Sequence, residues 1–407
     1  MMIAKIENKF YNKSMTEPLK KLHLLAEHVG YELDDTPGCP LFVRPNPEQT
    51  IEKMATDQVP SISYATLPGG RKIPLLKTLL TSACEKDCHY CGCRSGSNIR
   101  RETFKPEELA RLFMMMYRKG YVKGIFLSSG VIGGGARTQD LLIKTAEILR
   151  FKFRYRDYLH LKIMPGSEYD QVLQSMKLAD RVSTNLEGAN PKRLYELAPM
   201  KQFHQQLLDP LKWIDDIRKN MSPAVTWNGR WPSTCTQFVV GGTDENDVEL
   251  LQISEFLYSH LHLSRTYYSA FSPIPGTPLE HRQAENDWRR YRLFQASFLL
   301  RDYPFQMEDM AFDHQGRLPL DRDPKQAWAE VFLKDQPVEV NTASREELLH
   351  IPGIGLKGAN QIVVTRYKNP FKSEGDLKRV GVILGRAAPY LLVNGSRLPF
   401  QPALIGS

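Results

Sequence analysis

The chain has 407 residues, of which 42% are hydrophobic and 25% charged, and its formal net charge is +8. This composition is that of a globular protein with about two or three domains, and it excludes a disordered or fibrous chain. The excess of basic residues favours a polyanionic partner but does not identify it. The N-terminus lacks the apolar core of a signal peptide, and no window is apolar enough to span a membrane. We therefore expect a cytoplasmic protein without a membrane partner.

Residues 1–72 are expected to form an N-terminal extension with one helix, and a barrel domain is expected at 73–280, where short apolar runs alternate with amphipathic stretches. The apolar runs predict strands at 74–80, 122–129, 160–164, 181–187, 236–242 and 266–271. The amphipathic stretches predict helices at 106–118, 138–151, 168–178, 211–220 and 245–259. Strands that alternate with helices form parallel sheets, so the fold class is α/β. Six such repeats predict a partial (βα)6 barrel.

Four of the six cysteines lie within ten positions, directly after the first predicted strand of the barrel. Cys84, Cys88 and Cys91 have the spacing C-x3-C-x2-C, which in a reducing compartment indicates a metal or iron–sulfur site. Three thiolates can hold three irons of a 4Fe–4S cluster and leave the fourth iron open. The alternative is a zinc site completed by Cys93 or His89. No second ligand pair follows downstream, so we favour the cluster and expect Cys93 to be a buried thiol.

This loop resembles the cysteine motif of the radical S-adenosylmethionine (SAM) superfamily, and later strand ends fit the same family in chain order. Ser129 and Gly130 end the second strand, where the family's glycine-rich segment meets the SAM amino group. Asn185 and Glu187 end the fourth strand and resemble an N-x-E element that approaches the SAM ribose and methionine. The implied contacts after the fifth and sixth strands are Gly241, Gly242 and Pro275.

Taken singly, these glycines are consistent with ordinary turns, and Asn185 or Glu187 with a helix cap. The resemblance implies two cofactors, a 4Fe–4S cluster and SAM. It also implies a reducing electron donor such as flavodoxin or ferredoxin. The sequence singles out no catalytic side chain.

A connector of helix and loops at 281–336 leads to a second compact domain at 337–395 and a C-terminal tail at 396–407. In this domain Ser344 and Glu347 have the spacing of a helix capping box, and the turn Pro-Gly-Ile-Gly follows. The pattern resembles the helix-hairpin-helix domains of DNA-uptake and repair proteins, and it predicts a small all-α domain. The hairpin glycines would leave backbone N–H groups available to a phosphate. The predicted DNA contacts are Gly353, Ile354, Gly355, Lys357 and Gly358.

A second, degenerate hairpin has Gly381 in the place of Gly353. Residues 338–394 carry eight Lys or Arg and five Asp or Glu, which is a net charge of +3. This mild excess suits contact with a nucleic-acid backbone rather than base readout. The alternative is a protein-interaction module that has lost DNA binding.

The complete arrangement resembles a family of radical SAM proteins described as acting in DNA modification or repair. Its members tend to be encoded beside uracil-DNA-glycosylase-like proteins, which makes such a protein a candidate partner. The resemblance implies an enzyme that cleaves SAM to a 5′-deoxyadenosyl radical and uses the radical on DNA. Two alternatives stay open: modification of a structured RNA such as tRNA, and a non-enzymatic DNA-binding iron–sulfur protein that senses redox state.

Overall fold

The computed structural model describes residues 16–29, 62–66 and 72–399. Parts of the predicted extension and C-terminal tail therefore lie outside the described residues. The chain divides into two compact units, one formed by Met1–Glu245 and Phe256–Asp287 and the other by Asn246–Glu255 and Trp288–Ser407. The domain boundaries inferred from the sequence stay predictions. Within the described part of the chain, no helix combines the length and apolar composition that a membrane span requires.

One seven-stranded sheet forms the centre of the first unit, and its strands follow each other in chain order. They are β1 (Ile62–Thr66), β2 (Lys72–Leu79), β3 (Gly124–Ser128), β4 (Tyr158–Lys162), β5 (Arg181–Ser183), β6 (Ser233–Val240) and β7 (Arg265–Ala270). Strands β2 to β7 pair in parallel and correspond to the six predicted strands. Strand β1 is not among the predicted strands; it pairs antiparallel with β2.

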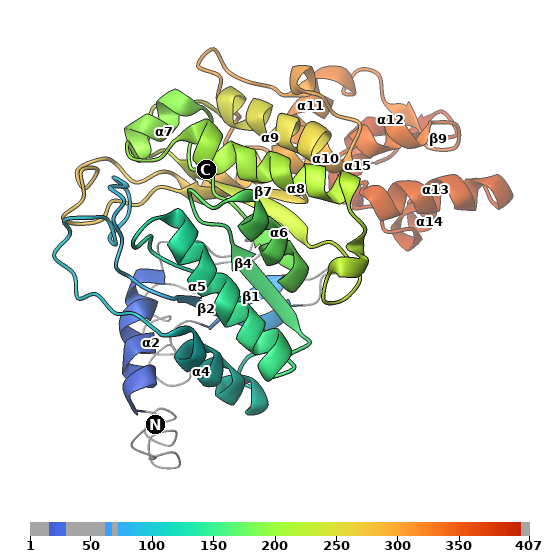
Figure 1. Cartoon of the computed structure of the whole chain (residues 1–407). Helices are drawn as coiled ribbons and strands as arrows, with labels where there is room; N and C mark the ends of the chain where they lie inside the picture. Colours follow the sequence, from blue (N-terminus) through green and yellow to red (C-terminus); the bar gives the residue numbers. More distant parts are fainter. Residues whose placement is uncertain (1–15, 30–61, 67–71, 400–407) are drawn as a thin grey trace. The chain divides into compact units, whose positions relative to one another are not determined.

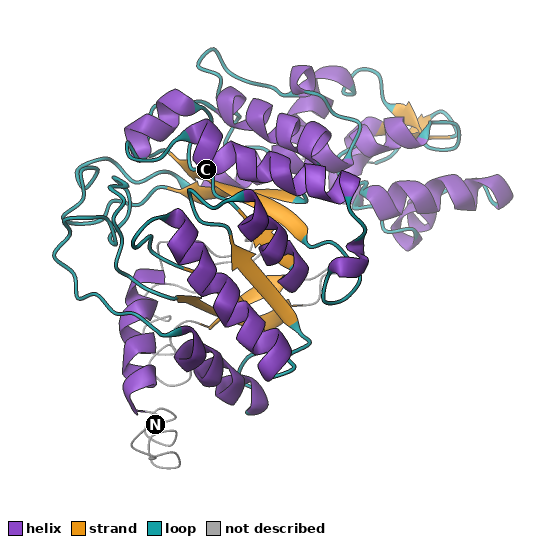
Figure 2. Cartoon of the chain, in the orientation of Figure 1, coloured by secondary structure: helices purple, strands orange, loops and turns teal. Residues whose placement is uncertain are grey.

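Helices link the successive parallel strands, and Figures 1 and 2 show α4, α5, α6 and α8 along one face of the sheet. The helices of this part are α2 (Thr16–Val29), α4 (Pro106–Arg118), α5 (Gly135–Glu147), α6 (Tyr169–Leu178), α7 (Pro191–Leu197), α8 (Asp209–Asn220) and α9 (Asp247–Leu261). Two π-helical segments (Ile148–Lys152 and Phe203–Leu208) and one 3-10 turn (Pro223–Val225) accompany them. Helix α4 buries Leu109, Leu112, Phe113 and Met116, whose spacing forms the apolar stripe of an amphipathic helix. The parallel strands thus curl into a half-barrel with helices outside, which confirms the predicted fold class.

Side chains on the parallel strands alternate between the helix-covered face and the concave face. Leu76, Ile125, Leu159 and Val182 are completely buried apolar residues of this unit. In the strand register, Lys77 of β2 pairs with Phe126 of β3. Phe126 pairs in turn with His160 of β4, and His160 with Arg181 of β5. The carboxyl ends of β2 to β7 meet at one rim, where barrel enzymes place their chemistry.

The second unit contains the predicted helical hairpins and a small sheet. Its elements are α10 (Asp287–Asp302), a 3-10 turn (Met307–Asp309), α11 (Pro324–Phe332), β8 (Val338–Glu339), α12 (Arg345–His350), α13 (Leu356–Lys368), α14 (Glu374–Arg379), α15 (Leu384–Ala387), a 3-10 turn (Ala388–Tyr390), β9 (Leu391–Val393) and β10 (Ser396–Arg397). The three short strands, which the sequence does not predict, form a sheet in the order β10-β9-β8. Leu348, Ile354, Ile362 and Leu377 share one buried core, so the hairpin helices pack as a single domain.

Candidate functional site

The cysteine loop leaves the carboxyl end of β2 and returns to the barrel before α4. Arg101 fastens the two ends of this loop, because its guanidinium donates to the carbonyl oxygens of Ser82 (2.5 Å) and Cys93 (2.7 Å). A bridge between Thr81 and Thr103 closes the loop at its base. The loop is therefore held in place although it contains neither helix nor extended strand.

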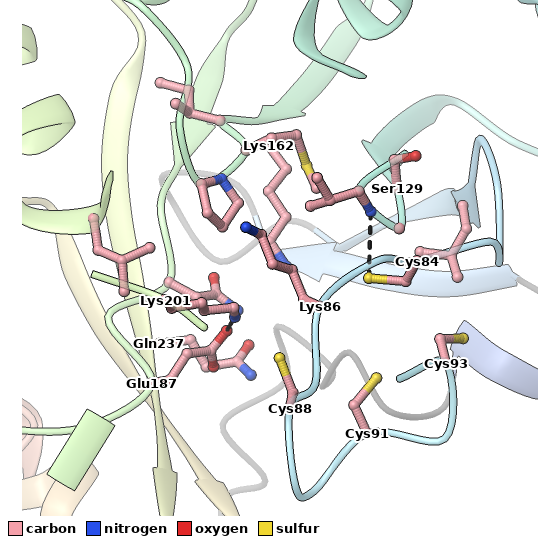
Figure 3. Close-up of a pocket in the computed structure, with 18 of the residues that line it drawn as sticks. Cys84, Lys86, Cys88, Cys91, Cys93, Ser129, Lys162, Glu187, Lys201 and Gln237 are labelled. Atoms are coloured by element: carbon pink, nitrogen blue, oxygen red, sulfur yellow. Dashed lines mark hydrogen bonds and ion pairs between the residues drawn. The ribbon is translucent and has the colours of Figure 1, made fainter. Parts of the chain in front are cut away.

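Three sulfur atoms face one shared space, which we call the cysteine pocket. Figure 3 shows the thiols of Cys84, Cys88 and Cys91 around this space, whereas the Cys93 sulfur, at its border, is directed away from Cys84 and Cys88. The Val131 N–H donates to Cys84 Sγ over 3.4 Å and so connects the loop to the segment after β3. The pocket is lined by Leu79, Cys84, Lys86, Cys88, Tyr90, Cys91, Cys93, Ser129, Gly130, Val131, Lys162, Ile163, Met164, Pro165, Asn185, Glu187, Lys201, Leu207 and Gln237. Among the described residues, no three His, Cys, Asp or Glu side chains converge on the position of a single metal ion.

Two thiols of the loop, those of Cys88 and Cys91, have raised pKa values. Burial raises the pKa of Cys88 to about 11, although the nearby Lys201 ammonium opposes the shift. A hydrogen bond with Cys93, together with burial, holds the pKa of Cys91 well above its usual range. Metal binding needs the thiolate, so loading the site must release protons.

Glu187 occupies an unusual backbone position at the rim of the pocket. Its φ angle is +64°, and its backbone bridges to β6, because its N–H donates to the Gln237 carbonyl (2.9 Å) and its carbonyl accepts from Val239 (2.8 Å). A non-glycine residue with positive φ is uncommon and marks a conformation that its surroundings enforce. The side chain does not cap the next helix; Asn190 does so by accepting from the Arg193 N–H.

Lys201 pairs with Glu187 inside the pocket. The Lys201 Nζ lies 3.0 Å from Glu187 Oε1, and the two side chains are only 9% and 5% exposed. Burial lowers the pKa of Lys201, but the neighbouring Cys88 sulfur and the Glu187 carboxylate, which also accepts its hydrogen bond, outweigh burial, and the net shift is upward. The ion pair with Glu187 therefore favours the cationic form of Lys201 beside the cysteine loop.

The pocket contains two buried side-chain oxygen atoms, Ser129 Oγ and Glu187 Oε2, whose hydrogen bonding bears on ligand binding. Among the described residues, neither Ser129 Oγ nor Glu187 Oε2 finds a hydrogen bond. Leaving such an atom buried costs about 1–3 kcal/mol, so a ligand that bonds to it gains affinity. Next to them, a Cβ added to Gly130 would lie 2.3 Å from the Ala83 carbonyl oxygen, so only glycine permits this approach of β3 to the cysteine loop.

The predicted contacts divide into two groups. Ser129, Gly130, Asn185 and Glu187 line the cysteine pocket together with the three predicted ligands. The described lining does not include Gly241, Gly242 or Pro275, which the sequence placed in the same site.

The two glycines after β6 have a packing role in this structure. Gly241 has a φ of +84° and donates its N–H to Glu245 Oε1 (2.7 Å), while a Cβ on Gly242 would lie 2.7 Å from Leu197. Pro275 lies exposed in the loop after β7. A SAM contact at these three positions stays a prediction.

Three lysines of the pocket, Lys86, Lys162 and Lys201, are not predicted from the sequence. Lys86 lies between two of the cysteines, and Lys162 ends β4. Lys201 lies in a turn that belongs to no recognisable motif. The position of Lys162 at a strand end was the one available signal, since the carboxyl ends of the strands border the site.

In the second unit, the predicted hairpin joins α12 to α13. Ser344 Oγ accepts from the Glu347 N–H (3.1 Å) and the Glu347 carboxylate accepts from the Ser344 N–H (2.6 Å), which confirms the capping box. Gly353 has a φ of +87°, and a Cβ there would lie 2.5 Å from the Ile383 carbonyl oxygen. The Ile383 N–H donates back to Gly353 over 3.0 Å. The two hairpins therefore contact each other through their turns.

The five predicted DNA contacts have different surroundings. Gly355 is the N-cap of α13 in an extended conformation, and Lys357 is exposed on its first turn. The Ile354 side chain is buried, and Gly358 is buried as well. Ile354 and Gly358 could therefore contact DNA only through their backbone atoms. All five, including Gly353, border one depression of this unit.

Comparison with known protein families gives two matches. Residues 78–257 match the model of the radical SAM superfamily, and residues 334–385 match the model of the helix-hairpin-helix motif. The chain thus contains a radical SAM domain followed by a helix-hairpin-helix motif. A search of curated proteins found no significant match.

Several solved structures resemble the chain. Methylornithine synthase (PylB) is 12% identical over 56% of this chain and 61% of its own, with a TM-score of 0.44. The FeFe-hydrogenase maturase HydG from Carboxydothermus hydrogenoformans is 14% identical over 56% of this chain and 51% of its own, also at 0.44. A second structure of HydG is 12% identical over 71% of this chain and 65% of its own, again at 0.44. The chain thus spans less than two thirds of each of these proteins.

A radical SAM domain implies a 4Fe–4S cluster and SAM as cofactors. The residues present fit both. A cubane takes one thiolate per iron, so it needs separate thiols around a space rather than three that converge on one ion. Cys84, Cys88 and Cys91 provide such a set. Ser129 Oγ and Glu187 Oε2, which accept no hydrogen bond from the described residues, are placed to bond with a polar molecule beside them.

Proposed function

We propose that this protein is a radical SAM enzyme that modifies or repairs DNA. The observation that supports the proposal is the presence in one chain of a radical SAM domain and a helix-hairpin-helix motif whose turn retains the glycine at a positive φ. The first unit provides the reactive site, and the second provides the contact to nucleic acid.

In this proposal, Cys84, Cys88 and Cys91 bind the cluster. Ser129, Gly130, Asn185 and Glu187 bind and orient SAM beside it. Bound there, a reduced cluster and SAM would supply radical chemistry, the reductive cleavage of SAM to a 5′-deoxyadenosyl radical. Lys201 keeps the Glu187 carboxylate in place through their buried ion pair. Tyr90, whose pKa is raised by burial and by nearby Glu187, stays neutral and covers the cysteine loop against water.

The tail docks on DNA in this proposal through the phosphate backbone. The first N–H groups of a helix have no intrahelical acceptor and attract anions, and α13 begins directly after the hairpin glycines. Lys357 adds a cation on the first turn. A duplex base would have to leave the stack to reach the rim of the barrel.

The test uses the full chain, reconstituted with iron and sulfide without oxygen. Methionine and 5′-deoxyadenosine are measured after reduction with SAM, in the presence of duplex DNA, single-stranded DNA or tRNA, and the nucleosides are analysed by mass spectrometry. We expect DNA to increase turnover and to yield a nucleoside of altered mass. The matched control is Cys88→Ala, which should bind DNA as the wild type does but produce neither product. A modified nucleoside from tRNA alone would assign the enzyme to RNA. Absence of methionine and 5′-deoxyadenosine under every condition would indicate a redox sensor.

A further inference from the structure

The two hairpins of the second unit have the same turn conformation. Gly353 of the first hairpin has a φ of +87°, and Gly381 of the second has a φ of +84°. The residue that follows the glycine is buried in both turns, as Ile354 in the first and Val382 in the second. The second hairpin is therefore a structural counterpart of the first, although its sequence is degenerate.

The two turns differ at the next residue, where a helix begins. In the first hairpin this residue is Gly355, the N-cap of α13. In the second it is Ile383, the N-cap of α15, whose backbone N–H donates to the Gly353 carbonyl over 3.0 Å. The Ile383 side chain is apolar and yet 59% exposed, and α15 has only four residues. A glycine lets a phosphate approach the start of a helix closely, whereas an exposed isoleucine suits an apolar group of a ligand.

Ile383 borders the same depression as the first hairpin, and we call this hollow the hairpin depression. Its volume of about 570 Å³ lies within the range of about 300–1,000 Å³ that is usual for small-molecule sites. Besides the two turns, its wall contains Phe298, Leu299, Tyr303 and Leu356. A phosphate contact alone needs no such wall. A nucleobase does, because its faces stack on aromatic rings and pack on apolar side chains.

The charges of the hairpin depression fit a nucleotide better than a neutral apolar molecule. Its described lining contains three basic side chains, Lys325, Lys357 and Arg386, and one acidic side chain, Asp323. Asp323 forms an ion pair with Arg386 and accepts from the Gln326 N–H over 3.1 Å. This pair is neutral as a whole, so the lysines give the depression its excess of positive charge. Apolar walls combined with positive charge are the means by which proteins bind single-stranded nucleic acid.

From this arrangement we propose that the hairpin depression binds one unpaired nucleotide of the DNA. The base packs against Ile383 and the aromatic wall, while the first hairpin contacts the phosphate backbone. The proposal rests on the DNA function proposed above and names its substrate class, which is DNA with an unpaired base rather than a fully paired duplex. It concerns recognition and is independent of which base the radical attacks.

The test compares the affinities of three labelled DNA duplexes by fluorescence anisotropy. The protein is the full chain with its cluster reconstituted, without reductant and without SAM. One duplex is fully paired, one contains a single unpaired thymidine, and one has an abasic residue at that same position. We expect the unpaired base to raise the affinity over the abasic duplex about fivefold or more, as for the stacking of one base. The salt dependence of these two affinities should be equal, because the two duplexes carry the same phosphates.

Variants at the second turn assign the preference to the hairpin depression. Ile383→Ser removes the apolar contact at an exposed position, so the variant should fold normally. It should lose the preference for the unpaired base and keep the affinity for the fully paired duplex. Ile383→Gly, which makes the second turn equivalent to the first, should have the same effect, whereas Ile383→Val should retain the preference. The matched control is Val364→Ser, at a 70% exposed position of α13 outside the described lining, which should bind all three duplexes as the wild type does.

Two results would overturn the proposal while DNA binding itself persists. One is equal affinity of the wild type for the unpaired and the abasic duplex. The other is a preference that survives both Ile383→Ser and Ile383→Gly, since the base would then bind elsewhere in the chain. Failure of the proposed DNA function gives a different result, in which none of the three duplexes binds, and that result overturns both proposals.

Discussion

Lys201 and Glu187 form a buried ion pair beside Cys88, with 3.0 Å between Nζ and Oε1. Breaking such a pair from one side leaves a buried charge without its partner, which costs about 3–5 kcal/mol. Lys201→Met should therefore lower the free energy of unfolding strongly. The double variant Lys201→Met/Glu187→Gln should recover most of the loss, because no charge remains buried. Urea unfolding of the full chain measures both; a single variant as stable as the wild type would mean that water reaches the pair.

If Cys84, Cys88 and Cys91 bind the cluster, alanine variants of the four cysteines in this loop should differ in iron binding. Replacing Cys84, Cys88 or Cys91 by Ala should abolish the bound iron and the electron paramagnetic resonance signal of the reduced cluster, since each thiolate holds one iron. Cys93→Ala should retain both, because its sulfur is directed away from Cys84 and Cys88 and lies outside the set of three thiols. Iron analysis of protein purified without oxygen checks this. Stoichiometric zinc in place of iron would contradict the cluster.

Asn185 lines the cysteine pocket and is one of the residues proposed to bind SAM. Asn185→Ala should weaken SAM binding by roughly threefold to tenfold, as expected for the loss of one hydrogen bond. Asn190→Ala is the matched control. Its side chain caps α7, so its loss should lower stability by about 1 kcal/mol but leave SAM affinity unchanged. Equal SAM affinities for Asn185→Ala and the wild type would exclude this contact.

The strands and the cysteine loop were predictable because their signals are local. Apolar runs such as that of β3 and the spacing of Cys84, Cys88 and Cys91 depend only on neighbouring residues. Strand β1 was missed because its sequence, Ile-Ser-Tyr-Ala-Thr, contains no apolar run of the kind that marks the other strands. Lys201 was missed because it meets Glu187 only after the chain has folded. A long-range ion pair leaves no periodic trace in the sequence.

The hairpin glycines also show that sequence alone does not reveal long-range contacts. The sequence treats Gly353 and Gly355 as equivalent members of one turn. In the structure only Gly353 has a positive φ and a backbone neighbour that a Cβ would strike, whereas a Cβ on Gly355 meets nothing closer than the Tyr303 hydroxyl at 3.6 Å. Which glycine is structurally required thus depends on the second hairpin, far along the chain.

Substitutions at Gly353 and Gly355 should therefore have different effects, the first on folding and the second on DNA binding. Gly353→Ala should destabilise the second unit, whereas Gly355→Ala should fold normally and weaken DNA binding by crowding the first N–H groups of α13. Lys357→Ala should weaken binding evenly across sequences and lower the salt slope by about one unit. Fluorescence anisotropy with labelled duplexes at several salt concentrations measures these effects. Full DNA affinity in a chain that ends at Pro337 would move the interface to the first unit.

The second unit should become more stable as the pH rises above neutrality. Burial, assisted by Arg386, lowers the pKa of Lys325 from 10.5 to about 7, while its Nζ donates to the Ile354 carbonyl over 2.6 Å. Between these values the unfolded chain binds a proton that the folded chain does not. The free energy of unfolding therefore rises with pH in this window, by at most about 1.4 kcal/mol per pH unit. Urea unfolding at pH 7.5, 8.5 and 9.5 should show the slope, and Lys325→Met should flatten it. An identical slope in that variant would assign it to other groups.

Strand β1 limits how far the chain can be truncated from its N-terminus. An uncovered sheet edge presents a row of unsatisfied N–H and C=O groups, which is a template for association with other chains. Because β1 pairs with β2 from Ile62↔Leu76 to Thr66↔Lys72, a chain that begins at residue 73 would expose the edge of β2 from Ile73 to Leu76. Such a chain would retain every ligand of the site and still be prone to aggregate. Recombinant forms intended for crystallisation should therefore begin before Ile62.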